Sequence, residues 1–429
     1  MSKEMNLIPE LRFPEFANNG KWDNKPISKL GETVNGLSGK KGADFGSGRP
    51  YVQYKQVFDK SFIDFTECGK VDVGENENQN QLQLGDILFT TSSETPDEVG
   101  FASVINKQPE EPTYLNSFCF ILRPNDLNEI NPGFSRYLFH SPIYRKSVSA
   151  IAQGSTRYNL SKKAFLKLRV PVPSTPEEQQ KIASCLSSLD ELIAAHNDKL
   201  DALKDHKKGL LQNLFPQEGE TVPKVRFPEF EEDGEWELKP FSKFIKLYRG
   251  SSPRPIREYL TKEETGVNWI KIGDTSSITD FVIRSVSEKI TPKGAEKSRR
   301  VKKGELILAN SMSYGSTYLL EVEGCIYDGW FVLREYEEHF DKQFLLQLLN
   351  SEYTQGQYKR FAAGGIVQNI SSEIVYSITL SKTSKEEQQK ISSCLSALDE
   401  LITAQQEKIE QLQQHKKGLM QGLFPKIND

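Results

Sequence analysis

The most regular hydrophobic pattern in the chain has heptad spacing. In residues 177–214, the positions every seven residues from 182 to 210 are Ile182, Leu189, His196, Leu203 and Leu210, and further apolar residues flank them on both sides. This spacing predicts an amphipathic helix with a wide apolar stripe. Thr175 followed by Pro176 and Glu178 predicts a capping box with proline in the first turn, and Pro216 marks the end of the helix.

The same helix is written a second time. EEQQKIASCLSSLDELI (177–193) returns as EEQQKISSCLSALDELI (386–402), and HKKGLLQNLFP (206–216) returns as HKKGLMQGLFP (415–425). Each helix is a rod of about 55 Å, and so wide a stripe needs a partner. A tandem duplication favours an antiparallel, coiled-coil-like pair over packing of each helix on its own domain. The residues expected in this pairing are Ile182, Leu189, Leu192, Leu203, Leu210, Ile391, Leu398, Leu401, Leu412 and Leu419.

The regions ahead of the two helices mix strand and helix patterns. Short β-branched or aromatic runs predict strands in 82–91, 117–123, 166–173, 266–272, 304–310 and 329–334, whereas 132–152 and 340–364 have helical spacing. The opening IPELRFPEF (8–16) also returns, as VPKVRFPEF (222–230). We therefore expect an α+β fold with a pseudo-twofold internal repeat: a globular domain at 1–174, a helix at 175–215, a second globular domain at 216–383 and a second helix at 384–425.

The two copies match at their ends and diverge in their middles. Only traces align between the anchors, such as LGDILF near Leu84 with KGELIL near Lys303. Free drift would scatter the differences along the helices as well. The pattern therefore favours one physical task performed on two different objects.

Composition excludes several classes of protein. The chain has 429 residues, with 55 Lys and Arg against 59 Asp and Glu, so its overall charge gives no argument for nucleic acid. No apolar run approaches a membrane span, and the polar start lacks a signal peptide. Five cysteines without a CxxC pair, and no zinc-ligand spacing, favour free thiols in a reducing cytoplasm and no bound metal or cofactor.

Catalytic motifs are missing from the sequence. There is no GxxxxGK[ST], GxGxxG after a strand, GxSxG or HExxH. The tetrapeptide beginning at Asn131 is close to the NPP[FY] of amino-methyltransferases, but it lacks the second proline and reads as a turn before a helix. We therefore expect a chain that is not itself an enzyme.

Local charge points to binding. Residues 131–176 contain no Asp or Glu but eight Lys or Arg, with GSTRYNLS at 154–161 offering Arg157, Tyr158 and Asn159 for phosphate and base-edge contacts. The matching place in the second copy offers Gln368 and Asn369. Further candidates for contact with DNA are basic or small polar residues in loops: Lys40, Lys41, Arg49, Thr91, Ser92, Arg249, Arg254, Arg257, Asn310 and Ser311.

Each candidate has a plainer interpretation. The Gly-rich segment around Lys40 is equally plausible as an ordinary loop entering a strand, and Asn159 and Asn369 suit turns or caps. Because residues shared by both copies cannot explain different specificities, Arg157 is favoured over Asn159 for base reading. The loops of Thr91 and Asn310 follow corresponding strands, so they are expected beside the first set.

The doubled EEQQKI…LDELI…HKKGL[LM]Q-x-LFP helix and the doubled RFPEF opening resemble the specificity subunit of type I restriction–modification enzymes, over essentially the whole chain. The resemblance implies two target recognition domains that read the halves of a bipartite site on double-stranded DNA. It implies partners: two modification subunits that methylate adenine N6 with S-adenosylmethionine, and two restriction subunits that use ATP and Mg. It also implies that the helices set the spacing of the half-sites.

The competing class is a duplicated protein-interaction scaffold without nucleic acid, which leaves the acid-free segment unexplained. A third alternative, a fused homodimeric enzyme, would need a catalytic motif.

Overall fold

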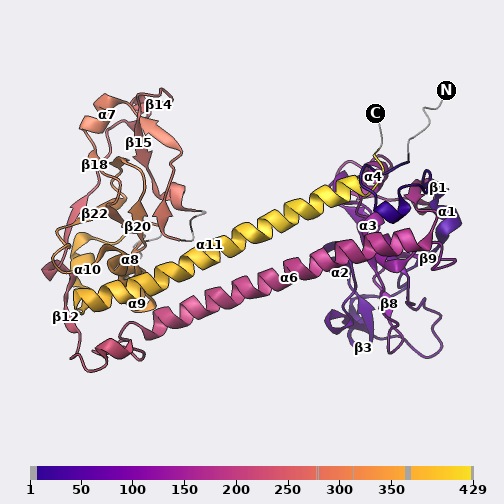
Figure 1. Ribbon diagram of the computed structural model, residues 1–429, viewed down its shortest axis with the longest axis horizontal. Helices are drawn as coiled ribbons and strands as arrows, with labels where there is room; N and C mark the ends of the chain where they lie inside the picture. The colour runs from indigo at the N-terminus through magenta and orange to yellow at the C-terminus, as the bar shows by residue number, and fades with distance from the viewer. Residues whose placement is uncertain (1–6, 277, 279, 313, 363–368, 427–429) are drawn as a thin grey trace. The chain divides into compact units, whose positions relative to one another are not determined.

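The protein forms two compact units in a computed structural model that describes residues 7–276, 278, 280–312, 314–362 and 369–426. Unit 1 comprises Met1–Asn197 with Lys408–Asp429, and unit 2 comprises Asp198–Glu407. Each unit holds a globular α+β region together with parts of two long helices, α6 (Pro176–Asn213) and α11 (Lys385–Gly422) (Figure 1). The predicted α+β fold, with a long helix after each globular region, is confirmed.

Unit 1 contains two main sheets. The larger has the order β2-β9-β5-β7 and is antiparallel throughout, and the smaller has the order β4-β3-β8 with β8 parallel to β3. Two-stranded ribbons join β1 to β11 and β6 to β10. The strands are β1 (Asp23–Pro26), β2 (Gly31–Asn35), β3 (Phe45–Val52), β4 (Gly69–Val71), β5 (Ile87–Thr90), β6 (Ser92–Ser93), β7 (Ala102–Val104), β8 (Tyr114–Leu115), β9 (Cys119–Pro124), β10 (Tyr158–Asn159) and β11 (Arg169–Val172). The short helices are α1 (Ile27–Leu30), α2 (Tyr54–Asp59), α3 (Pro132–Leu138), α4 (Pro142–Ser149) and α5 (Lys162–Lys167).

Unit 2 repeats this topology, but each of its two main sheets has five strands. Its sheets have the orders β13-β22-β19-β20-β16 and β14-β17-β15-β21-β18, and a ribbon joins β12 to β23. The strands are β12 (Glu237–Pro240), β13 (Lys246–Arg249), β14 (Leu260–Thr261), β15 (Val267–Ile270), β16 (Val282–Ile283), β17 (Glu288–Ile290), β18 (Arg299–Val301), β19 (Leu306–Ala309), β20 (Thr317–Leu320), β21 (Gly324–Ile326), β22 (Trp330–Arg334) and β23 (Thr379–Lys382). The helices are α7 (Pro292–Glu296), α8 (Lys342–Asn350), α9 (Glu352–Ala362) and α10 (Ser372–Ser377). The predicted internal repeat is therefore visible in the order of the strands.

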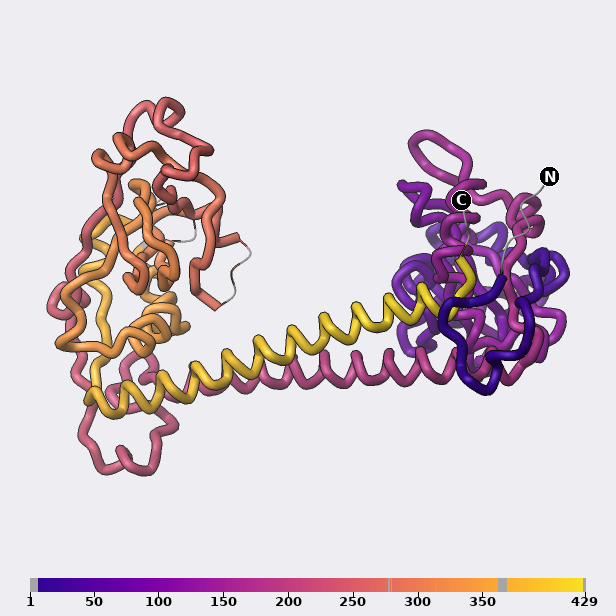
Figure 2. Tube along the Cα trace, turned by 45° about the horizontal axis from the view of Figure 1, so that its top comes forward, coloured from indigo at the N-terminus to yellow at the C-terminus, as the bar shows by residue number. Residues whose placement is uncertain are grey.

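The residue pair that follows each long helix lies in a core formed by other parts of the chain. Phe424, after α11, is 1% exposed in unit 1, and its ring centre lies 5.9 Å from that of Trp22 and 5.6 Å from that of Phe134. Figure 2 shows this yellow end of α11 among the indigo and purple segments of unit 1. In unit 2, Phe215 after α6 packs in the same way against Trp236. The LFP motif therefore anchors each helix end by hydrophobic burial.

A buried ion pair joins the repeated RFPEF opening to the repeated EEQQ helix start. In unit 1 the Arg12 guanidinium donates from Nε and Nη2 to the two carboxylate oxygens of Glu178, each at 2.8 Å, and the Trp22 indole donates to the same carboxylate at 3.0 Å. Arg226 and Glu387 form the same two-bond pair in unit 2, at 2.7 and 2.8 Å. Such a fork fixes both partners in one geometry. The two motifs thus recur together because they bind each other.

The predicted capping box at the start of α6 is wrong. Both halves of the box are missing: Thr175 Oγ1 is buried without a hydrogen-bond partner in the described part of the chain, and the Glu178 carboxylate binds Arg12 and Trp22. Pro176 does occupy the first helical position, as predicted. At the start of α11, Ser384 Oγ accepts the backbone N–H of Glu387 at 3.3 Å, which is half of a capping box.

The two long helices pair within each unit. In unit 2, Lys207 Nζ of α6 lies 2.5 Å from Asp399 Oδ1 of α11, and in unit 1 Lys416 of α11 pairs with Asp190 of α6. Each contact joins the later part of one helix to the earlier part of the other. The pair is therefore antiparallel, as predicted.

The ten residues predicted to form the helix seam differ in burial. Eight of the ten are buried or half-buried, namely Ile182, Leu189, Leu203, Leu210, Ile391, Leu398, Leu412 and Leu419. Leu192 and Leu401 are 44% and 55% exposed, so their assignment to the pairing is wrong. They lie at corresponding places in the two copies, on a flank of the apolar stripe. Ile182 and Ile391 also belong to the globular cores, which cover the part of the stripe near each helix start.

Candidate nucleic-acid interface

A short ladder in unit 1 brings most of its predicted contact residues together. Strands β6 and β10 pair so that Ser92 lies opposite Asn159 and Ser93 opposite Tyr158. The carbonyl of Thr91 accepts the N–H of Leu160 at 2.8 Å. We call Thr91, Ser92 and Arg157–Asn159 the first reading edge. The expectation that the loop after β5 lies beside GSTRYNLS is confirmed.

Arg157 is the exposed cation of the first reading edge. Its guanidinium carbon lies 5.9 Å from the ring centre of Phe118, an exposed aromatic residue that directly precedes β9. Asn159 belongs to β10 and exchanges backbone hydrogen bonds with Gln153 at 3.0 and 2.8 Å, so it pairs extended segments and neither caps nor turns the backbone. Arg157 thus has an exposed charge, whereas the backbone of Asn159 has a structural role.

Two residues that support this edge were missed or undervalued by sequence reasoning. The Tyr54 hydroxyl donates to the carbonyl of Ser92 at 2.6 Å, and burial raises the pKa of this phenol. Phe118 lies in a run predicted to be a strand, where it would share a face with the buried Phe120. The strand begins only at Cys119, which leaves Phe118 in the preceding turn.

Most cations of the acid-free segment are used inside unit 1. The Arg136 guanidinium pairs with Asp190 at 2.9 Å and lies 4.3 Å from the ring centre of Phe62. Arg145 donates to the carbonyls of Gly100 and Val99, and burial lowers its pKa. The acid-free run of sequence therefore does not present all of its cations to a ligand. These two arginines are paired with a carboxylate of α6 and with backbone carbonyl oxygens.

The Gly-rich loop of unit 1 follows the plainer interpretation. Lys40 pairs with Glu77 at 2.5 Å, and a hydrogen bond from the Lys40 ammonium lowers the pKa of that carboxyl. Arg49 on β3 pairs with Glu111 at 3.1 Å, and Lys41 is exposed. Within the described residues, no hydrogen bond, ion pair or ring contact links these three cations to the first reading edge.

Unit 2 has a corresponding edge. Ser311 forms an isolated bridge with Asn369, and the carbonyl of Asn310 accepts the N–H of Ile370 at 2.7 Å. These contacts repeat those of Ser92 with Asn159 and of Thr91 with Leu160 in unit 1. We call Asn310, Ser311 and Asn369 the second reading edge; Gln368 lies outside the described residues. The Asn310 side chain is 3% exposed and donates to the carbonyl of Asp328 at 3.0 Å, so it supports the loop from within.

The arginines predicted for unit 2 lie near this edge. Arg249 Nε donates to the carbonyl of Asp328 at 3.3 Å, and Arg254 lies 3.7 Å from its carboxylate. A hydrogen bond from Ser252 and these two cations lower the pKa of Asp328. Arg254 and Arg257 line a hollow of 920 Å³ whose wall includes Tyr327. Tyr327 OH lies 3.4 Å from Ser311 Oγ, which connects the hollow to the second reading edge.

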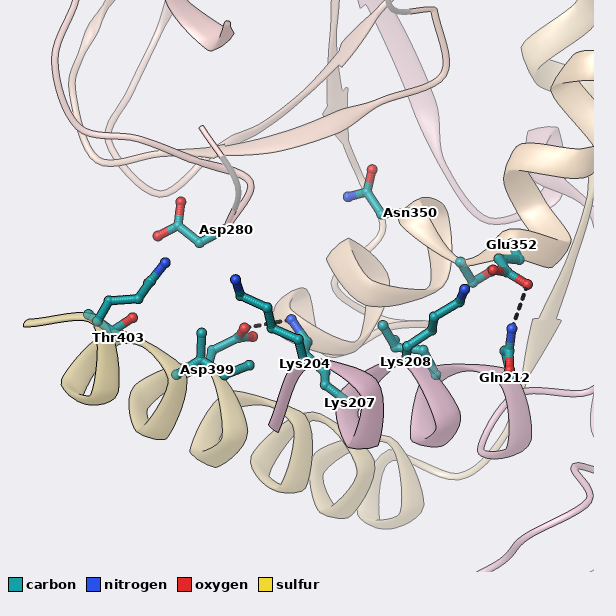
Figure 3. Close-up of a pocket in the computed structure, with 13 residues that line it drawn as sticks. Lys204, Lys207, Lys208, Gln212, Asp280, Asn350, Glu352, Asp399 and Thr403 are labelled. Atoms are coloured by element: carbon teal, nitrogen blue, oxygen red, sulfur yellow. Dashed lines mark hydrogen bonds and ion pairs between the residues drawn. The ribbon is translucent and has the colours of Figure 1, made fainter. Parts of the chain in front are cut away.

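A separate hollow of 420 Å³ lies beside the helix pair of unit 2 (Figure 3). Lys204, Lys207 and Lys208 of α6 line it, and Asp280 and Asn350 of the globular region face them. It contains none of the predicted contact residues. Lys207 is held there by the ion pair with Asp399, so the HKK motif contributes to helix pairing and not only to the helix end.

The described residues contain neither a metal-binding group nor a membrane-spanning helix. No group of three or more His, Cys, Asp or Glu could hold a metal ion, and all five cysteines are free. No helix in the described ranges is long and apolar enough to span a membrane. Asn131 accepts the N–H of Phe134 at 3.1 Å and caps α3, as its interpretation as a turn before a helix predicts.

Comparisons with known proteins agree with this architecture. The model of the type I restriction modification DNA specificity domain matches residues 19–205 and again 234–414. A putative type I restriction enzyme MjaX specificity subunit of Methanocaldococcus jannaschii is 26% identical over 413 residues, which cover 94% of this chain and 92% of that protein. The type I restriction–modification S subunit of M. genitalium has the same fold, with a TM-score of 0.57 and 15% identity over 98% of this chain and all of that one.

A second solved chain, from work on complex assembly and conformational transition of the type I R-M system, has a TM-score of 0.63 and 14% identity over 94% of this chain and 97% of that one. With the two matches of the family model, these likenesses cover both units and both long helices. The chain belongs to the family of type I restriction–modification specificity subunits, which are non-catalytic and leave the catalytic activities to partner subunits.

Proposed function

We propose that this chain reads a bipartite site on double-stranded DNA, one half with each reading edge, and directs methylation and restriction by partner subunits. The observation that carries the proposal is the pair of reading edges: two loops meet in the same way in both units but present different side chains. Arg157 and Tyr158 mark the first edge, and Ser311 with neighbouring Arg254 marks the second. Two edges with the same backbone arrangement but different side chains suit the recognition of two different DNA sequences.

Family membership supports a proposal for the partners and their cofactors. We propose two modification subunits that transfer a methyl group from S-adenosylmethionine to adenine N6, one at each half-site. Two restriction subunits would add ATP- and Mg-dependent translocation and cleavage of unmodified DNA, in the cytoplasm. In this scheme the present chain binds DNA and partners but none of these cofactors.

The helix pair is proposed to set the spacer between half-sites. α6 and α11 each have 38 residues, or about 57 Å at 1.5 Å per residue. One turn of DNA is about 34 Å, so helices of this length are long enough to separate two half-sites by a turn or more. The proposed limits are 1–174 and 216–383 for the recognition domains and 175–215 and 384–425 for the spacer helices.

A salt titration of DNA binding tests this function against the scaffold alternative. Each phosphate neutralised by Lys or Arg adds about −0.9 to the slope of log K against log salt concentration. A steep negative slope for the complex with its modification subunits supports the proposal. A salt-independent association, or none, supports a scaffold that binds no nucleic acid.

A domain exchange tests independent reading. We expect replacement of residues 20–170 by the recognition domain of another family member to change one half-site and leave the other as it was. A change in both halves would contradict the assignment of one half-site to each domain.

A further inference from the structure

Unit 1 presents an exposed aromatic side chain beside the first reading edge. Phe118 is 57% exposed, more than any other large apolar residue of the described part of unit 1. Its backbone is fixed, because its N–H donates to Asn116 Oδ1 at 2.8 Å and its carbonyl accepts the N–H of Thr91 at 3.0 Å. The ring is therefore held outward by a rigid turn.

The surroundings of Phe118 distinguish it from a scattered surface residue. Single exposed apolar side chains are common on soluble proteins and need no explanation. The guanidinium carbon of Arg157 lies 5.9 Å from the centre of the Phe118 ring. The carbonyl of Phe118 also accepts the N–H of Thr91, the residue that precedes Ser92. An aromatic face beside an exposed arginine is the chemistry that stacks on nucleobases.

Unit 2 supplies an apolar side chain at the same edge from a different loop. The N–H of Asn310 donates to the carbonyl of Gly329 at 2.9 Å, in the way that Thr91 donates to Phe118. Glycine at that place has no side chain to project. Met312, just after Ser311, is instead 78% exposed, more than any other large apolar residue described in unit 2, and has φ of +56°, which is uncommon for a residue with a side chain.

We propose that Phe118 and Met312 are apolar wedges that enter the base stack of the DNA at the two half-sites. This inference rests on the proposed function. A base that is to be methylated must leave the stack, which costs unstacking energy and leaves a gap in the duplex. Some DNA-binding proteins insert apolar side chains between base steps, where these side chains partly unstack the bases and kink the duplex. The wedge of each unit would stabilise the gap left by the target adenine of its half-site.

The two wedges differ in chemistry. Phe118 offers a flat ring that can stack on a neighbouring base, whereas Met312 offers a flexible thioether that fills irregular space. The half-site of unit 1 should therefore depend more strongly on its wedge than the half-site of unit 2. Phe361 is exposed too, at 51%, but it lies near the end of α9 and not on the loop that carries Ser311.

The test uses the complex of the full chain with its modification subunits and a duplex that contains the target site. Phe118→Ala should slow methylation of the unit 1 half-site about tenfold and leave the other half-site unchanged. With 2-aminopurine in place of the target adenine, the rise in fluorescence on binding should be smaller for this variant. Leu84→Ala, which removes a 43% exposed side chain near the opposite end of β5, is the matched control and should match the unaltered complex.

A mismatched base pair at the target adenine separates a wedge from a merely structural role. Since a mismatched base is easier to extrude, this substrate should restore the methylation rate of Phe118→Ala. An unchanged rate in Phe118→Ala, or a loss that the mismatch does not restore, would overturn the wedge. Failure of the unaltered complex to bind any bipartite DNA would instead overturn the proposed function.

Discussion

Replacing Glu178 by glutamine should destabilise unit 1 by about 3 kcal/mol. The Glu178 side chain is 1% exposed and that of Arg12 is 9% exposed, so the substitution leaves a buried guanidinium without its counter-ion. Removing one partner of a buried pair costs about 3–5 kcal/mol, and the lower value applies because glutamine keeps one acceptor oxygen for Arg12 or Trp22. For a unit of this size that corresponds to a fall of roughly 6–12 °C in the melting temperature.

The assay must report on unit 1 alone, because two compact units need not unfold together. Hydrogen exchange of the amides of β5 and β9, two neighbouring strands of the main sheet of unit 1, measures its opening free energy directly. Glu177→Gln is the matched control, since Glu177 is the exposed neighbour of Glu178 on the same helix turn, and its effect should stay within about 0.5 kcal/mol. A Glu178→Gln loss below about 1 kcal/mol would refute the view that the ion pair joins the two motifs.

Four further outcomes are expected. Burial lowers the pKa of His140 to about 4; the unfolded chain therefore binds a proton between about pH 6.5 and 4 that the folded unit does not. The stability of unit 1 should fall over that range, by up to about 3 kcal/mol at pH 4, and His140→Gln should flatten the dependence measured by denaturant titration at several pH values. Phe424→Ala should cost unit 1 about 3–5 kcal/mol, seen as faster proteolysis of unit 1 but not of unit 2. Arg157→Ala should weaken specific binding by about 1–3 kcal/mol and relax one position of one half-site in a binding competition. Deleting four residues after Ala194 should shorten the spacer and preserve the base sequence of both half-sites. A change in the recognised bases at an unchanged spacing would contradict the proposal that the helix pair sets the spacer.

The repeated motifs allowed the framework to be predicted from sequence. Heptad spacing and the doubled helix were enough for the antiparallel pair, because helix packing follows directly from where apolar residues recur. Leu192 and Leu401 show the limit of that reasoning: the pattern gives the width of an apolar stripe but not how much of it a neighbour covers. Leucines of the same stripe are therefore buried or half-buried at some positions and exposed at Leu192 and Leu401.

Charge was the less reliable guide to the site. Arg136 and Arg145 lie in an acid-free run of sequence, yet their partners are Asp190, 54 residues after Arg136, and backbone carbonyls. Lys40 and Arg49 are likewise paired with acids that are distant in the sequence. Phe118 was missed because one residue of difference in where β9 begins decides whether its ring faces the core or solvent. Local sequence does not specify such long-range partners or strand ends.

We propose that this chain alone chooses a bipartite DNA target. Methylome sequencing of cells with and without the gene tests it most directly. We expect N6-methyladenine in a motif of two fixed halves with an unspecified spacer, present with the gene and lost without it. An identical set of methylated adenines in both kinds of cell would contradict it.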